Sequence, residues 1–429
     1  MREIAGVAGL VLLLVTACRF DTSGLQPRRP DAGGDLSLDL VLEGPPDAPR
    51  AERGDALLPP DGVGPREAAT DLPRADLPIT CVSNPTLCKG QTPVCDGNCR
   101  ACAAHSECPA GLCRADGSCP AASEISFVDV GCGSNQDGTS KKPFCTIAAA
   151  VGESPPYVLV RAGTYKDTTI DTSKEIYGEP GAILKPTACD KLVIDGKITV
   201  MLSGFEIQGN VIVKGGAKGT LLRNQIGPST CIGVNATGAE VKLDRNLIFA
   251  HLGGGVLLDG KYRVQNNIIV KNGKSDLTWG AVKIAATDPT SLFINNTVAS
   301  NIAKGSNDKE AGGVRCEAGA STAVFVNTIF WGNTFNSNAK AADDRQYGPG
   351  CAAQYSLEEL KSGATAASTN ISAPPQLAET GADTAAPYYR LKNSSPARDK
   401  GTKTGAPAVD YDGEPRDASP DIGADEIFP

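Results

Sequence analysis

The feature that most constrains the fold is a short phrase that returns five times between about Leu221 and Asn333. Each copy places a large apolar residue three positions before an asparagine and a β-branched residue two positions after it. The steps between these asparagines are 22, 21, 29 and 31 residues, and the asparagines are Asn224, Asn246, Asn267, Asn296 and Asn327. A period of this size indicates a stack of structural repeats.

The rest of the unit repeats as well. Glycine followed by a β-branched run recurs ahead of the asparagines, as at Gly233-Val234 and Gly255-Val256, and a turn then follows. About 21 residues at roughly 3.3 Å each make one closed coil of three short strands, and coils stacked about 4.8 Å apart form a parallel β-helix. An asparagine at one fixed corner can bond to the copies above and below, because its amide both donates and accepts. We therefore interpret the asparagines as a structural ladder.

These repeats resemble the right-handed parallel β-helix of the pectin-lyase-like superfamily. The resemblance implies an all-β fold over residues 124–373 and an affinity for polysaccharide surfaces. Residues 146–151, Thr-Ile-Ala-Ala-Ala-Val, resemble the short helix that plugs the first coil of many bacterial β-helix proteins. Residues 374–429 resemble their closing cap. Because the superfamily contains enzymes, adhesins and inert spikes, the fold does not settle the function.

The first residues resemble a bacterial lipoprotein signal. An apolar run from Ile4 to Val15 is too short to span a bilayer as a helix, and it ends in Val-Thr-Ala directly before Cys18. The resemblance implies that residues 1–18 are a signal peptide and that Cys18 carries lipid, which would place the protein in the cell envelope, on the outer membrane. An ordinary secretory signal is the alternative.

Two segments separate this signal from the β-helix. Residues 19–80 are rich in Pro, Asp, Ala and Gly, and we expect a disordered tether whose ends lie on the order of 45 Å apart. Eight of the 15 cysteines lie in residues 81–120, where few large apolar residues occur, so we expect a module held by four disulfides. A zinc site is the alternative. If Cys18 is lipidated, fourteen cysteines remain and permit seven bridges, among which we expect Cys132 to pair with Cys145.

The sequence argues against several kinds of chemistry. The net charge of −8 disfavours a nucleic-acid partner. Two histidines leave little room for Ser-His-Asp or His-metal chemistry, and we interpret His251 as a polar corner residue. The catalytic motifs of polygalacturonase-like and pectate-lyase-like proteins are absent. Asp410 and Asp412 suggest a turn rather than a calcium loop. We expect no catalytic set, no cofactor and no metal site.

Loops of increasing length leave the corner after His251, Asn272, Asn301 and Asn333, and they predict a polar wall along one edge of the stack. The wall supplies candidate glycan-binding residues, with aromatic rings expected to be partly exposed in one groove: Trp279, Tyr347, Asp276 and Asp308. Solvated insertions are the alternative.

We therefore expect a lipid-anchored envelope protein that binds a polysaccharide or another surface glycan. A polysaccharide lyase or glycoside hydrolase acting on an acidic polysaccharide is the first alternative, and a structural or adhesin-like surface protein is the second.

Overall fold

The computed structural model describes residues 88–96, 98–274, 276–305, 311–317, 323–337, 340–343, 346–360, 367–378 and 390–427. The predicted signal peptide, Cys18, the tether and Cys81 lie outside these residues. Across the described part of the chain, no helix is both long enough and apolar enough to cross a membrane.

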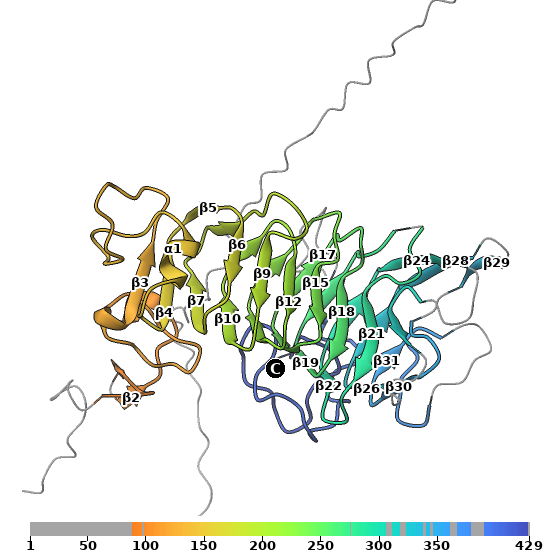
Figure 1. The fold of residues 1–429 in the computed structure, drawn as a ribbon. Helices are drawn as coiled ribbons and strands as arrows, with labels where there is room; N and C mark the ends of the chain where they lie inside the picture. The colour runs from red at the N-terminus through yellow and green to blue at the C-terminus, as the bar shows by residue number, and fades with distance from the viewer. Residues whose placement is uncertain are drawn as a thin grey trace, which may run out of the picture.

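The described chain winds into coils whose strands stack in three long parallel sheets (Figure 1). The ten-stranded sheet contains β3 (Ile125–Val128), β4 (Tyr157–Val160), β7 (Lys174–Gly178), β10 (Thr199–Ser203), β13 (Lys218–Leu222), β16 (Glu240–Asp244), β19 (Tyr262–Gln265), β22 (Leu292–Ile294), β26 (Ala323–Val326) and β30 (Cys351–Gln354). Each strand between the two end strands pairs in parallel with the strand of the coil before and after it. The predicted fold class, a parallel β-helix, is confirmed.

The other two sheets complete each coil. The nine-stranded sheet contains β5 (Gly163–Tyr165), β8 (Ala182–Leu184), β11 (Glu206–Ile207), β14 (Gln225–Ile226), β17 (Leu247–Phe249), β20 (Ile268–Val270), β23 (Thr297–Ala299), β27 (Ile329–Trp331) and β31 (Leu357–Glu358). The seven-stranded sheet contains β6 (Thr168–Ile170), β9 (Leu192–Asp195), β12 (Val211–Lys214), β15 (Val234–Thr237), β18 (Val256–Gly260), β21 (Val282–Thr287) and β25 (Val314–Cys316). A small sheet, β24 (Ile302–Gly305), β28 (Thr334–Ser337) and β29 (Lys340–Asp343), extends from the longer loops.

Apolar side chains from all three sheets fill the interior of the stack as one continuous core. The helix α1 (Ile147–Val151) lies across its first coil, and Ile147, Ala150 and Val151 are buried there. The Thr146 side chain caps α1 by accepting a hydrogen bond from the backbone N–H of Ala149, 3.2 Å away. The short helix therefore closes the apolar interior at one end.

Asparagines line one corner of the coils in a hydrogen-bonded ladder. The Nδ2 group of Asn224 donates to Oδ1 of Asn246, that of Asn246 to Asn267, and that of Asn267 to Asn296, over 3.0–3.1 Å. On the next coil, the residue that stacks on Asn296 is Thr328, because the neighbouring Thr297 pairs with Ile329. The assignment of Asn327 to the ladder is therefore wrong by one residue.

Asn327 instead belongs to the column just before the ladder, where the backbone is left-handed. Arg223, Arg245, Asn266, Asn295 and Asn327 all have φ between 48° and 56°. Asparagine tolerates this conformation better than most residues. Two asparagines in a row, as at Asn295-Asn296, can therefore fill both columns, and the sequence pattern alone does not distinguish them.

The cysteine module packs against the first coils through its second half. It contains β1 (Val94–Asp96), β2 (Asn98–Arg100) and the 3₁₀ turn His105–Glu107, and a second 3₁₀ turn, Ala122–Glu124, leads into β3. Leu112 joins Phe127 and Tyr177 in one apolar cluster. Arg114 binds the Glu175 carboxylate at 2.9 Å.

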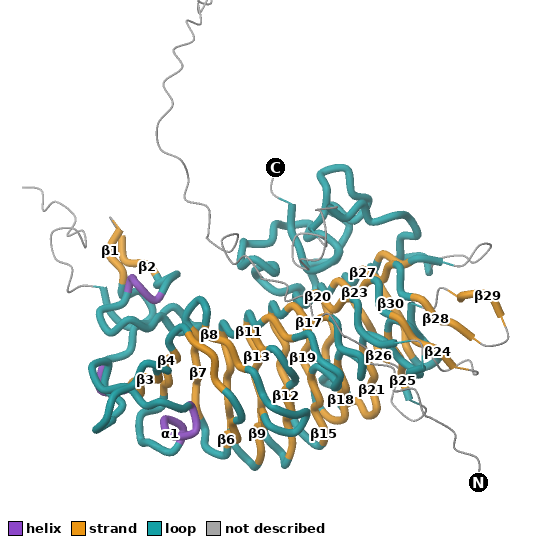
Figure 2. The backbone as a smooth tube through the Cα atoms, turned by 90° about the horizontal axis from the view of Figure 1, so that it is seen from above, coloured by secondary structure: helices purple, strands orange, loops and turns teal. Residues whose placement is uncertain are grey.

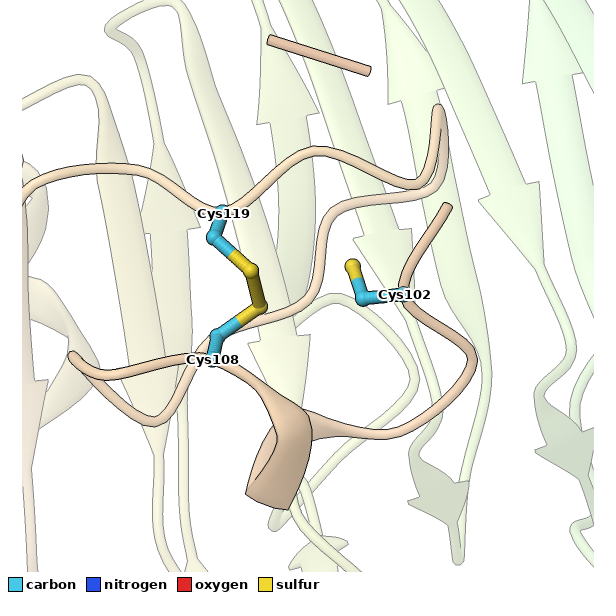
Figure 3. Close-up of side chains that lie close together, drawn as sticks. All are labelled: Cys102, Cys108 and Cys119. Carbon is cyan, nitrogen blue, oxygen red and sulfur yellow. A yellow bond between two sulfur atoms is a disulfide. The ribbon is translucent and has the colours of Figure 1, made fainter. Parts of the chain in front are cut away.

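Disulfides link Cys88–Cys99, Cys102–Cys113 and Cys108–Cys119 in this module, and Cys95 is disulfide-bonded as well. Figure 3 shows the Cys102 sulfur beside the Cys108–Cys119 bridge. Because Cys102 is itself paired with Cys113, these sulfurs are not thiolates free to bind zinc. Within the stack, the predicted Cys132–Cys145 bridge is confirmed, and Cys189–Cys231 and Cys316–Cys351 add two more.

The C-terminal segment folds back along the side of the stack rather than over its last coil (Figures 1 and 2). Asn266 donates to the carbonyl of Val409, and Asn295 to that of Asp421. Within the segment, the buried side chain of Arg416 pairs with Glu426 at 2.7 Å. The segment thus covers the left-handed corner column and part of the nine-stranded sheet.

Candidate functional site

The two aromatic rings of the loop wall do not lie together in one open groove as expected: Trp279 is buried, and Tyr347 is partly exposed. Trp279 is only 7% exposed. Its indole fills the space above Gly254, where an added Cβ would lie 2.4 Å from the ring. The glycine therefore creates a slot that the tryptophan occupies, and the prediction that Trp279 is partly exposed is wrong.

Tyr347 is also tied into the stack. Its ring centroid lies 5.5 Å from that of Phe330 and 6.2 Å from that of Phe325, both of which are buried. Its hydroxyl donates a hydrogen bond to the Glu358 carboxylate. Burial raises the pKa of Tyr347 above its ordinary value. The ring packs against the far end of the core, so the two aromatics do not form one open sugar-stacking groove.

The structure describes one of the two candidate acids of the wall. Asp276 is exposed and forms an ion pair with Lys274 at 3.0 Å. Asp308 lies outside the described residues. Trp279 fills its slot, Tyr347 packs on the core and Asp276 pairs with Lys274, so these three described candidates do not form a shared glycan site.

A different surface has the features of a binding site. A groove of about 340 Å³ runs over the outer face of β13, β16, β19 and the start of β22. Four cations line it, with one acid, Glu240, among them; the cations are Lys218, Lys242, Lys261 and Arg263. On a protein with a net charge of −8, this is a local concentration of positive charge.

Strand register places the groove residues in two rows that run along the stack. Lys218 pairs with Glu240 in the parallel ladder, and Thr220 pairs with Lys242, which pairs with Arg263. Side chains in one row are about 4.8 Å apart, the spacing of hydrogen-bonded strands. The rows therefore present cations at intervals set by the coils.

Acidic neighbours hold some of these cations in place. The Glu240 carboxylate lies 3.6 Å from the ammonium groups of both Lys218 and Lys261. Lys242 lies 3.3 Å from Asp244, which is almost buried. The two exposed pairs of Glu240 contribute little to stability, so Lys218 and Lys261 remain available to an incoming anion.

Sequence analysis missed this groove although a signal was present. The lining residues on the strands stand six and four positions before the ladder residue of their coil, as Glu240 and Lys242 do before Asn246. Lys261 and Arg263 have the same offset from Asn267. Aligning the coils on the ladder asparagines and comparing charges at equal offsets would have found the cationic rows.

His251 belongs to a second polar ladder. The asparagine ladder lies where the strands of the nine-stranded sheet begin, and this one lies where they end. Its backbone N–H donates to Oδ1 of Asn272 at 3.1 Å, and Asn272 and Asn301 make the same bond to the next coil. The side chain is fully buried, and burial lowers its pKa to about 4. His251 therefore lies at the polar corner position that its spacing predicts, and its imidazole is neutral near pH 7.

Three carboxylates approach one another in the C-terminal segment, but protein donors already engage them. Asp410 accepts from the backbone N–H groups of Gly413 and Glu414, which closes a turn. Asp425 accepts from Leu391, and Asp412 pairs with Arg390. These bonds assign the cluster to the packing of the segment.

Comparisons with known proteins add little beyond the fold. No protein-family model matches the chain, and no curated protein matches it significantly. Among solved structures it is similar to pectate lyase Pel9A, with 13% identity and a TM-score of 0.35 over 71% of this chain and 96% of that one.

It is also similar to a pectin methylesterase in complex with a hexasaccharide, with 14% identity and a TM-score of 0.34 over 57% of this chain and 92% of that one. A pectin methylesterase from Aspergillus niger gives 18% identity and a TM-score of 0.26 over 58% and 93%. Similarities at this level carry no functional argument.

Proposed function

We propose that this protein binds an acidic polysaccharide along the cationic groove and is displayed on the bacterial cell envelope by lipid on Cys18. The observation that supports binding is that cations fill four of the six places made by two strand positions on three successive coils, namely Lys218, Lys242, Lys261 and Arg263. A polymer with regularly spaced carboxylates can engage several of these cations at once, because the coil repeat sets the spacing between them.

The chemistry of the groove suits a carbohydrate. Thr220 on β13, Leu292 at the start of β22 and Thr290 in the turn before β22 also line it. Hydroxyls and ammonium groups bond sugar hydroxyls, and the apolar patch accepts a C–H face. Since Glu240 lies among the cations and the whole protein is acidic, a densely charged phosphate polymer is disfavoured.

The test is binding of the purified chain to soluble uronic-acid polymers, with a neutral glucan for comparison. The double variant Lys242→Ala/Arg263→Ala should weaken binding to the acidic polymer about 10-fold at low salt, from two lost exposed charge contacts. Binding by the wild-type protein should also weaken as salt rises, since solvent-exposed charges are screened.

The matched control is Lys197→Ala/Lys214→Ala, which removes two exposed lysines beside the seven-stranded sheet. Equal losses of affinity in the two double variants would refute binding at the groove. So would binding of the neutral glucan as tight as that of the acidic polymer. Incubation of the same polymers also checks for catalysis, because a lyase produces an unsaturated product that absorbs ultraviolet light and a hydrolase produces new reducing ends.

A further inference from the structure

A second pocket lies at the corner between the nine- and seven-stranded sheets. It has a volume of about 220 Å³ and is lined by the connections that follow β8, β11 and β14: residues 186–189, 208–210 and 228–231. The Cys189–Cys231 disulfide joins the first and third of these connections. The pocket walls are therefore held across coils by a covalent bond.

Ser229 lines this pocket and contacts His251. Its Oγ lies 2.7 Å from Nδ1 of His251. The Ser229 side chain is partly exposed, whereas His251 is fully buried. The backbone N–H of Cys231 also donates to Oγ, at 3.2 Å. The serine is thus held between a fixed donor and a ring nitrogen, with one side open to the pocket.

The tautomer of His251 follows from its other nitrogen. Nε2 lies 3.0 Å from the carbonyl oxygen of Ile226, which can only accept. Nε2 therefore carries the proton, and Nδ1 offers its lone pair to the Ser229 hydroxyl. A nucleophile that donates to an imidazole, which is itself oriented by an acceptor, has the arrangement of an activated serine.

This pair departs from the pattern of the following coils. Asn272, Asn301 and Asn333 take the same corner position, and the first two bond to the next asparagine through backbone and side chain. An asparagine is therefore sufficient to make the hydrogen bonds between coils at this corner. The ladder therefore explains the place of His251, but it does not require an imidazole facing a serine hydroxyl.

Asn210, on the preceding coil, points to a ligand in the same pocket. It lines the pocket and is 3% exposed. Its Nδ2 donates to the carbonyl of Cys189 at 2.7 Å, but its Oδ1 has no hydrogen-bond partner among the described residues. A buried acceptor without a partner is costly, and a ligand O–H or N–H would satisfy it.

We propose that Ser229 and His251 form an acyl-transfer site for a short-chain ester whose alcohol carries a further hydroxyl, which Asn210 Oδ1 accepts. Ser229 Oγ attacks the ester carbonyl carbon, its proton passes to His251 Nδ1, and the departing alcohol takes that proton. Water then attacks the acyl-serine and gives a proton to Nδ1, which returns it to Oγ as the carboxylic acid leaves. One ester and one water give one acid and one alcohol. The site is separate from the cationic groove and does not rest on it.

The experiment treats the full chain with a fluorophosphonate probe and measures labelling by mass spectrometry of peptides, alongside hydrolysis of p-nitrophenyl acetate. Wild-type protein should be labelled at Ser229, and Ser229→Ala should not. His251→Asn should slow labelling at least about 100-fold, the usual scale of a general base. It should remain folded, because asparagine is the residue of the neighbouring coils, and its melting curve verifies this.

Thr237→Ala is the control, since Thr237 is an exposed hydroxyl on β15 that bonds to Asn235 outside the pocket. It should be labelled and hydrolyse the ester like the wild type. Folded wild-type protein that is not labelled at Ser229, or folded His251→Asn protein labelled at the wild-type rate, would overturn the proposal. Ser229→Cys provides a second test, because His251→Asn in that background should slow alkylation of the thiol by iodoacetamide, and an unchanged rate would also overturn the proposal.

Discussion

His251 titrates, whereas the asparagines that take its place on the following coils do not. Burial lowers its pKa in the folded protein to about 4, and the ordinary value is 6.5. Between these values the unfolded chain binds more protons than the folded one, so acidification favours unfolding. A shift of about 2.5 units corresponds to about 3 kcal/mol of stability that is present near pH 7 and lost as the pH falls to about 4.

We predict that His251→Asn removes this pH dependence. Asp421 and Asp425 act in the opposite direction, because burial raises their pKa values to about 6 and about 7, and their ionisation destabilises the fold as the pH rises. Both proteins contain these acids, so the difference between their free energies of unfolding isolates His251. Urea titrations at several pH values should show the variant gaining about 3 kcal/mol relative to wild type between pH 7 and pH 4. Parallel pH profiles would contradict this.

Single residues also show which parts of the structure can be predicted from the sequence and which cannot. The ladder position was readable because each asparagine keeps a fixed offset from apolar neighbours. Asn327 was assigned wrongly because the left-handed column also accepts asparagine. The expectation that Trp279 is partly exposed fails because the sequence of an insertion does not show in which direction an aromatic side chain points. The slot at Gly254 that receives it lies on the preceding coil and exists only once the coils are stacked.

At the scale of the element, each ladder residue serves two coils. Asn246 Oδ1 accepts from both the backbone N–H and Nδ2 of Asn224, and its own Nδ2 donates to Leu221 O and Asn267. We predict that Asn246→Ala destabilises the protein by about 2–4 kcal/mol, because it leaves buried donors and acceptors unpaired. Chemical unfolding measures this.

Asn235→Ala is the matched control for the ladder. Asn235 lies on β15, is partly exposed, and accepts one bond from Thr237. Its loss should change the free energy of unfolding by less than about 1 kcal/mol. Similar effects at the two sites would mean that the ladder has no special role in holding coils together.

Strand content and coil spacing were predictable at this scale because they depend on local periodicity. The cationic groove was not predicted, since its residues come from strands about 20 positions apart and acquire a common face only through register. The same holds for Ser229 and His251, which are 22 residues apart in the sequence. They meet because they take the same position on two successive coils.

At the scale of the whole molecule, the proposed anchor is the testable part. Replacing Cys18 with Ala should release the protein from the membrane fraction, because durable attachment needs the acyl chains that this cysteine would carry. Fractionation followed by immunodetection measures the shift. Replacing Cys189 together with Cys231 is the control, since it removes two cysteines far from the signal. Equal membrane retention of Cys18→Ala and wild type would disprove lipid anchoring.

The position of the C-terminal segment has a consequence for how the chain is made. Apolar residues of the nine-stranded sheet, among them Phe249, Ile268 and Val270, share a cluster with Ala424, which is synthesised more than 150 positions later. A chain that emerges from its N-terminus first therefore exposes this flank until the segment after residue 390 arrives. During synthesis the half-built stack is open to aggregation and to proteases, and the last stretch of translation ends that exposure.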